Sequence, residues 1–131
     1  RRVLAAFGGL CVGETGPGIE CAASDIVFRD ADSEMETEDR WGVCLRTRLV
    51  CIGAEHNEHS ALFIDNSGRV FGASLIHDAF YLNGLDFWTG VENALLGRRS
   101  QPLLHPTQQF VTLYGERYEA GDPRLFSFEG A

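Results

Sequence analysis

The apolar residues of this chain occur mostly in short β-prone runs. These runs predict strands at 10–12, 26–28, 49–52, 61–64, 69–71, 79–82 and 109–114. The turn sequence Asp65-Asn66-Ser67-Gly68 separates two of the runs and predicts a β-hairpin. Short connections favour antiparallel neighbours, because parallel strands need long crossovers. The pattern therefore predicts an antiparallel meander.

A first helix is predicted at the start of the chain. Val3, Leu4 and Phe7 share one helical face, and Gly8-Gly9 ends that helix. The sequence begins with Arg-Arg-Val and has no initial Met. We therefore expect this segment to be the last part of a longer, truncated helix.

A second helix is predicted over residues 33–48. Ser33 and Glu36 fit a capping box, and Trp41 and Leu45 lie on one apolar stripe. The first half of this helix is rich in acids, while the apolar stripe begins in its second half. We expect the first half to be exposed and the second half to pack on the core.

A third helix is predicted after Asp86, which is a good N-cap residue. Trp88, Val91 and Leu95 repeat at helical spacing, and Gly97 ends the helix. This spacing favours a core position for Trp88.

Together these elements predict an α+β fold, in which helices pack on one face of an antiparallel β-sheet. We expect a single domain over residues 1–104, since the pattern weakens beyond Pro102. Residues 105–131 are then a C-terminal extension, either an arm that contacts a partner or an ordinary extension.

The charge of the chain restricts its partners. Its 131 residues contain 11 arginines, no lysine and 19 acids, which gives a net charge of −8. Binding of nucleic acid needs clustered cations, and a membrane span needs a long apolar run; the sequence has neither. We therefore expect a soluble protein without a nucleic-acid or membrane partner. An acidic protein suits a basic protein partner, because opposite charges attract at long range.

The strongest feature of the composition is the acidic run DADSEMETED, residues 30–39, which holds six acids and no base. One interpretation is a charged helix start that aids solubility. The other is a surface that faces a basic groove, such as the active site of a nuclease. On the second interpretation, the predicted partner-binding residues are Asp30, Asp32, Glu34, Glu36, Glu38, Asp39 and Trp41. Trp41 is either an apolar anchor for the partner or a core residue.

The glycine-rich stretch FGGLCVGETGPGIEC, residues 7–21, is a candidate phosphate site. A P-loop needs a lysine, and the chain has none. A dinucleotide fingerprint needs a third glycine where Cys21 stands. We therefore interpret the glycines as turn residues.

Metal and catalytic motifs are also weak. His56 and His59 lie beside two glutamates but lack the H-E-x-x-H spacing, so a solvated loop is favoured over a weak metal site. The chain has no G-x-S-x-G motif and no C-x-x-C pair, and we expect its four cysteines to be reduced apolar fillers. We predict no cofactor, no resident metal and no enzymatic activity. A metal-dependent hydrolase that uses His56 and His59 is the weakest alternative.

Four ordered motifs resemble those of one protein family. They are FGGL at 7–10, GPG at 16–18, LFIDNSGRVF at 62–71 and LLG at 95–97. Over about residues 3–99, the set is similar to the third subgroup of the SUKH superfamily, which comprises bacterial immunity proteins. The acidic run and residues 105–131 match no motif of that group.

This resemblance implies an α+β fold and a cytoplasmic protein that is not an enzyme. It implies that the protein binds and neutralises a cognate polymorphic toxin by occluding it, and such toxins are often nucleases. Other members of the superfamily are regulatory or scaffolding modules, and that is the alternative function. Fold alone does not decide between the two.

Overall fold

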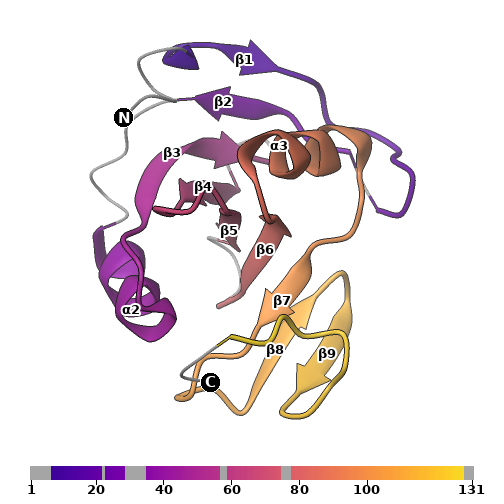
Figure 1. Cartoon of the computed structure of the whole chain (residues 1–131). Helices are drawn as coiled ribbons and strands as arrows, with labels where there is room; N and C mark the ends of the chain where they lie inside the picture. The colour runs from indigo at the N-terminus through magenta and orange to yellow at the C-terminus, as the bar shows by residue number, and fades with distance from the viewer. Residues whose placement is uncertain (1–6, 22, 29–34, 57–58, 75–77, 129–131) are drawn as a thin grey trace.

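The computed structural model describes residues 7–21, 23–28, 35–56, 59–74 and 78–128. Figure 1 shows their arrangement. The elements are β1 (Cys11–Val12), β2 (Ile26–Phe28), α2 (Met35–Leu45), β3 (Val50–Glu55), β4 (Ser60–Ile64), β5 (Val70–Ser74), β6 (Phe80–Gly84), α3 (Phe87–Leu96), β7 (Gln101–Leu103), β8 (Phe110–Leu113) and β9 (Glu116–Glu119).

Strands β1 to β7 form one antiparallel sheet in which the spatial order of the strands follows their order in the chain. Strands β8 and β9 form a separate two-stranded hairpin. The α+β class and the antiparallel meander predicted from the sequence are therefore confirmed.

Helices α2 and α3 lie on opposite faces of the sheet (Figure 1). On one face, Trp41 and Leu45 of α2 pack against Phe63 and Phe71. On the other face, α3 covers a cluster that contains Leu62 and Val70. Neighbouring residues of a strand point to opposite faces, so β4 and β5 each contribute apolar side chains to both clusters. The expectation that the helices pack on one face is wrong in this respect.

Helix α2 begins at Met35 and ends at Leu45, three residues earlier than predicted. Arg46 follows it with φ 57°, the left-handed conformation that ends many helices and that glycine usually adopts there. The amide of Thr47 then donates to the carbonyl of Gly42. The chain thereby turns from α2 into β3 over a very short connection.

Helix α3 has the ends that the sequence predicts. Asp86 is its N-cap, and the Asp86 carboxylate accepts a hydrogen bond from the amide of Thr89 at 2.8 Å. Gly97 ends the helix with φ 71°. At the start of the chain, Phe7 is helical and Gly9 has φ 84°, in agreement with a helix that stops there. Val3 and Leu4 lie outside the described residues.

The C-terminal part contains two strands that the sequence patterns did not predict, β7 and β9. Strand β7 carries Pro102 at the edge of the sheet, a position where a missing N–H is tolerated. Beyond β9, Phe126 and Phe128 pack against the cluster that includes Trp41. The division of the chain after residue 104 stays a prediction.

Candidate interaction surface

The acidic run leads into α2. Its described members are Glu36, Glu38 and Asp39, which lie in the first half of the helix. Glu36 and Asp39 are exposed and Glu38 is half-buried. Asp30, Asp32 and Glu34 lie outside the described residues.

Glu38 also has a structural contact. Its Oε2 accepts a hydrogen bond of 2.7 Å from the backbone amide of Cys51 in β3. Strand β2 pairs with β3 only over Gly53–Glu55, so it does not reach this amide. The carboxylate of Glu38 thus provides an acceptor that β2 does not supply, and it ties α2 to the sheet.

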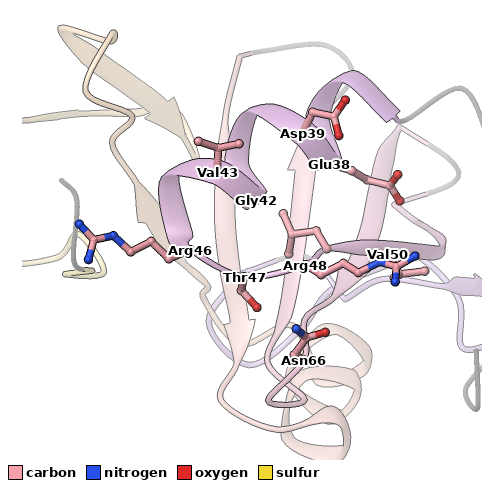
Figure 2. A pocket seen from close by; sticks show the side chains of 10 residues that line it. Glu38, Asp39, Gly42, Val43, Arg46, Thr47, Arg48, Val50 and Asn66 are labelled. Atoms are coloured by element: carbon pink, nitrogen blue, oxygen red, sulfur yellow. The ribbon is translucent and has the colours of Figure 1, made fainter.

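A groove of about 960 Å³ lies beside this helix (Figure 2). Glu38 and Asp39 of α2 line it, and so do Arg46 and Arg48, whose side chains extend in opposite directions in Figure 2. Val43 projects outward from α2 and is 80% exposed. The remaining lining residues are Gly42, Thr47, Leu49, Val50 and Asn66. The groove therefore combines charges of both signs with an exposed apolar side chain.

The two tryptophans lie in different environments, and only Trp41 is in the core. Trp41 is only 2% exposed, and its ring stacks on Phe80 at a centroid distance of 4.5 Å. Of the two alternatives for Trp41, the core position is the one it occupies. Trp88 was favoured for the core, but it is 68% exposed. That expectation is wrong, because α3 turns Val91 and Leu95 toward the sheet and Trp88 away from it.

A buried carboxylate lies under α3. Glu55 is 1% exposed, and it accepts hydrogen bonds from the hydroxyl of Tyr81 at 2.6 Å and from Nδ2 of Asn83 at 3.0 Å. Burial raises the pKa of Glu55 above its ordinary value of 4.5, against the opposing effects of His56 and these two donors. Ser100 extends the network, since its hydroxyl donates to Oδ1 of Asn83 at 2.6 Å. The network is fully packed, and the cavity beside it has room for about one water molecule.

This carboxylate does not form a metal site with the histidines that the sequence singled out. Nε2 of His56 is 3.8 Å from Oε1 of Glu55, and His59 is exposed. Within the part of the chain that the structure describes, no three His, Cys, Asp or Glu side chains are grouped as metal ligands would be. All four cysteines belong to that part, and none forms a disulfide.

The model of one protein family, described as SUKH-3 immunity protein, matches residues 1–97. The chain belongs to the SUKH-3 immunity protein family. No curated protein and no solved structure matches the chain. No helix among the described residues is long and apolar enough to span a membrane.

Two of the SUKH-3-like glycine motifs meet in space. A Cβ atom on Gly18 would lie 2.7 Å from Cα of Gly97, so the two backbones approach too closely for a side chain. The amide of Ile19 donates to the carbonyl of Leu96 at 2.9 Å, and the amide of Cys21 donates to that of Gly97 at 2.8 Å. The glycine-rich segment therefore packs directly against the backbone at the C-terminal end of α3. The glycines shape the connection, as the turn interpretation expected.

The net negative charge belongs to the part of the chain that matches the SUKH-3 family. Residues 1–97 contain seven arginines and 15 acids, whereas residues 98–131 contain four of each. Among the described residues of this part, Glu116, Glu119 and Asp122 each form an ion pair with an arginine. For example, Arg99 and Arg124 both contact Oε2 of Glu116. A basic partner that is attracted by charge would therefore be drawn to residues 1–97.

Proposed function

We propose that this protein neutralises a cognate toxin by binding it tightly and covering its functional surface. The match of residues 1–97 to the SUKH-3 immunity protein family carries this proposal. On this proposal, the protein acts in the cytoplasm of the producing bacterium, in stoichiometric amounts and without catalysis.

The partner that fits is a protein with a basic surface. The excess of acids in residues 1–97 supports this, and so does the acidic start of α2 beside the groove. A toxin that cleaves nucleic acid has such a surface, because its active site must attract phosphates. We therefore propose that the toxin is a nuclease and that Glu36, Glu38 and Asp39 face its basic groove, together with the preceding acids Asp30, Asp32 and Glu34.

The first experiment tests the activity. The gene that neighbours the one for this protein is expressed alone and together with this protein. Growth, nuclease activity and co-purification of the two proteins are measured. We expect the neighbour to be toxic alone, to be harmless with this protein and to co-purify with it. A neighbour that is neither toxic nor bound favours the regulatory or scaffolding module.

The second experiment tests the acidic surface. The six acids of residues 30–39 are replaced by the corresponding amides, which keep their shape and the acceptor oxygen at position 38. We expect the association rate to fall at least about tenfold at low salt and to lose most of its salt dependence. The control is Glu119→Gln, which removes one exposed charge from the C-terminal hairpin. Unchanged association by the six-amide variant would show that the acids serve only solubility.

A further inference from the structure

An aromatic cluster lies where α3 begins. Phe87 and Trp88 are its members from α3, and Phe7 and Phe28 come from the N-terminal segment and β2. Phe7 contacts all of the others, with ring centroids 5.5 Å from Phe28, 5.8 Å from Phe87 and 6.0 Å from Trp88. The cluster joins three elements that are far apart in the sequence.

The outer side of this cluster is apolar and exposed. Trp88 is 68% exposed, and Leu85, just before the helix, is 64% exposed. We use the term Trp88 patch for Phe7, Leu85, Phe87 and Trp88. A tryptophan is costly to leave in water, because its ring is the largest apolar surface among the side chains.

The Trp88 ring is held in position. It meets Phe7 edge-on at 86° and Phe87 at 5.0 Å and 73°. The first turn of α3 is fixed by Asp86, whose two carboxylate oxygens accept from the amide and the hydroxyl of Thr89. A side chain that is already ordered loses little entropy when a partner covers it. Such residues are typical binding hot spots.

The segments that form the patch contain more acids than arginines, even when Arg29, Arg98 and Arg99 at their ends are counted. Residues 7–28 and 84–97 together contain five acids, Glu14, Glu20, Asp25, Asp86 and Glu92, and no arginine. In the sequence, the acidic run of residues 30–39 starts two residues after Phe28, a member of the aromatic cluster. The charge around the patch is therefore complementary to a basic partner.

We infer that the Trp88 patch is the anchor of the toxin interface, where Trp88 enters an apolar pocket that lysines or arginines surround on the toxin. This inference rests on the proposed function and names the contact by which that function is carried out. The acids steer the encounter, and the tryptophan holds the complex. On this inference, Trp88 is the apolar anchor, and not Trp41.

The test measures the affinity of the toxic domain encoded beside this gene for wild-type protein and for variants. We expect Trp88→Ala to weaken binding at least about 30-fold through faster dissociation, and Trp88→Phe to weaken it less. The matched control is Phe110→Ala, which removes an exposed aromatic side chain from β8, outside the family match. We expect that variant to bind within about twofold of wild type. Unfolding temperatures of all variants establish that each is folded.

A spectroscopic measurement gives a second readout that does not depend on affinity. The protein is labelled with 5-fluorotryptophan, and the Trp88→Phe variant assigns its two ¹⁹F resonances. We expect saturating unlabelled toxic domain to shift the Trp88 resonance and to leave that of buried Trp41 nearly unchanged.

The outcomes separate this inference from the proposed function. If wild type does not bind the toxic domain, the proposed function fails and the inference with it. If wild type binds and protects but Trp88→Ala binds equally well and the Trp88 resonance stays in place, the inference alone is overturned. If both measurements respond as expected, the patch is the anchor.

Discussion

At the scale of single residues, the buried Glu55 dominates the polar interior. Its carboxylate joins β3 to β6 through Tyr81 and Asn83. Removing a carboxylate from water favours its neutral form, and this is why the pKa of Glu55 is raised. Because the folded state holds the proton more tightly than the unfolded state, Glu55 links the stability of the protein to pH.

The first prediction concerns this linkage. A raised folded pKa means that the stabilising contribution of Glu55 is present below its unfolded pKa, near 4.5, and is lost as the pH rises through the folded pKa. Glu55→Gln cannot titrate. We therefore expect the free energy of unfolding of the variant, relative to wild type, to increase from pH 4 to pH 8 in urea titrations.

The control is Glu92→Gln, an exposed carboxylate on α3. A difference for Glu55→Gln that stays constant across this range would show that the folded and unfolded states bind the proton equally well.

At the scale of elements, α3 packs unusually closely on the sheet. Gly90 is the buried residue of this helix, and a Cβ atom there would lie 2.6 Å from Cβ of Val70. Gly84 of β6 faces the same backbone, and a Cβ on it would lie 2.5 Å from the amide nitrogen of Gly90. Two glycines therefore set the distance between α3 and the sheet and, with it, the position of the Trp88 patch.

The second prediction tests this packing. Alanine favours a helix by about 1 kcal/mol over glycine. At Gly90, however, its methyl group would overlap Val70, which is fully buried and cannot move aside. We expect Gly90→Ala to lower the free energy of unfolding by about 1–3 kcal/mol, measured by urea denaturation.

The comparison variant is Glu92→Ala on the exposed side of the same helix. There the change in stability should be within about 0.5 kcal/mol. Equal stability of Gly90→Ala and wild type would mean that α3 can move away from the sheet without cost.

At the scale of the whole molecule, the C-terminal segment lies beyond the family match but contributes to the core. Val111 and Tyr118 of the β8–β9 hairpin are buried with Ala79, and Phe126 and Phe128 cover the cluster around Trp41. Tyr114, in the turn between β8 and β9, has a φ of 55°. Its hydroxyl accepts a hydrogen bond of 2.7 Å from the amide of Ser100. Burial raises the pKa of Tyr114 to about 12.

The third prediction follows from these contacts. Removing residues 105–131 would expose apolar surface of both clusters. We expect the truncated protein to lose at least about 10 °C in unfolding temperature or to unfold without a cooperative transition, as followed by circular dichroism. Unchanged melting would show that the extension is independent of residues 1–104, as a separate arm would be.

The sequence by itself determined the elements whose cause is local. The hairpin at Asp65–Gly68, the N-cap Asp86 and the helix end at Gly97 depend on a few neighbouring residues, and each is found where the pattern predicts it. The ordered motifs also indicated the family, because glycine spacing and hairpin turns are written directly in the chain.

Only the tertiary structure decided which face each helix covers. Helical spacing shows that one side of a helix is apolar, but not which of its borderline residues the sheet covers. This is why Trp41 is buried on one face while Trp88 is exposed beside the other. Strands β3 to β5 have apolar residues on both faces and can receive a helix on either side. Helix α2, which precedes β3, covers one face, and α3, which follows β6, covers the other.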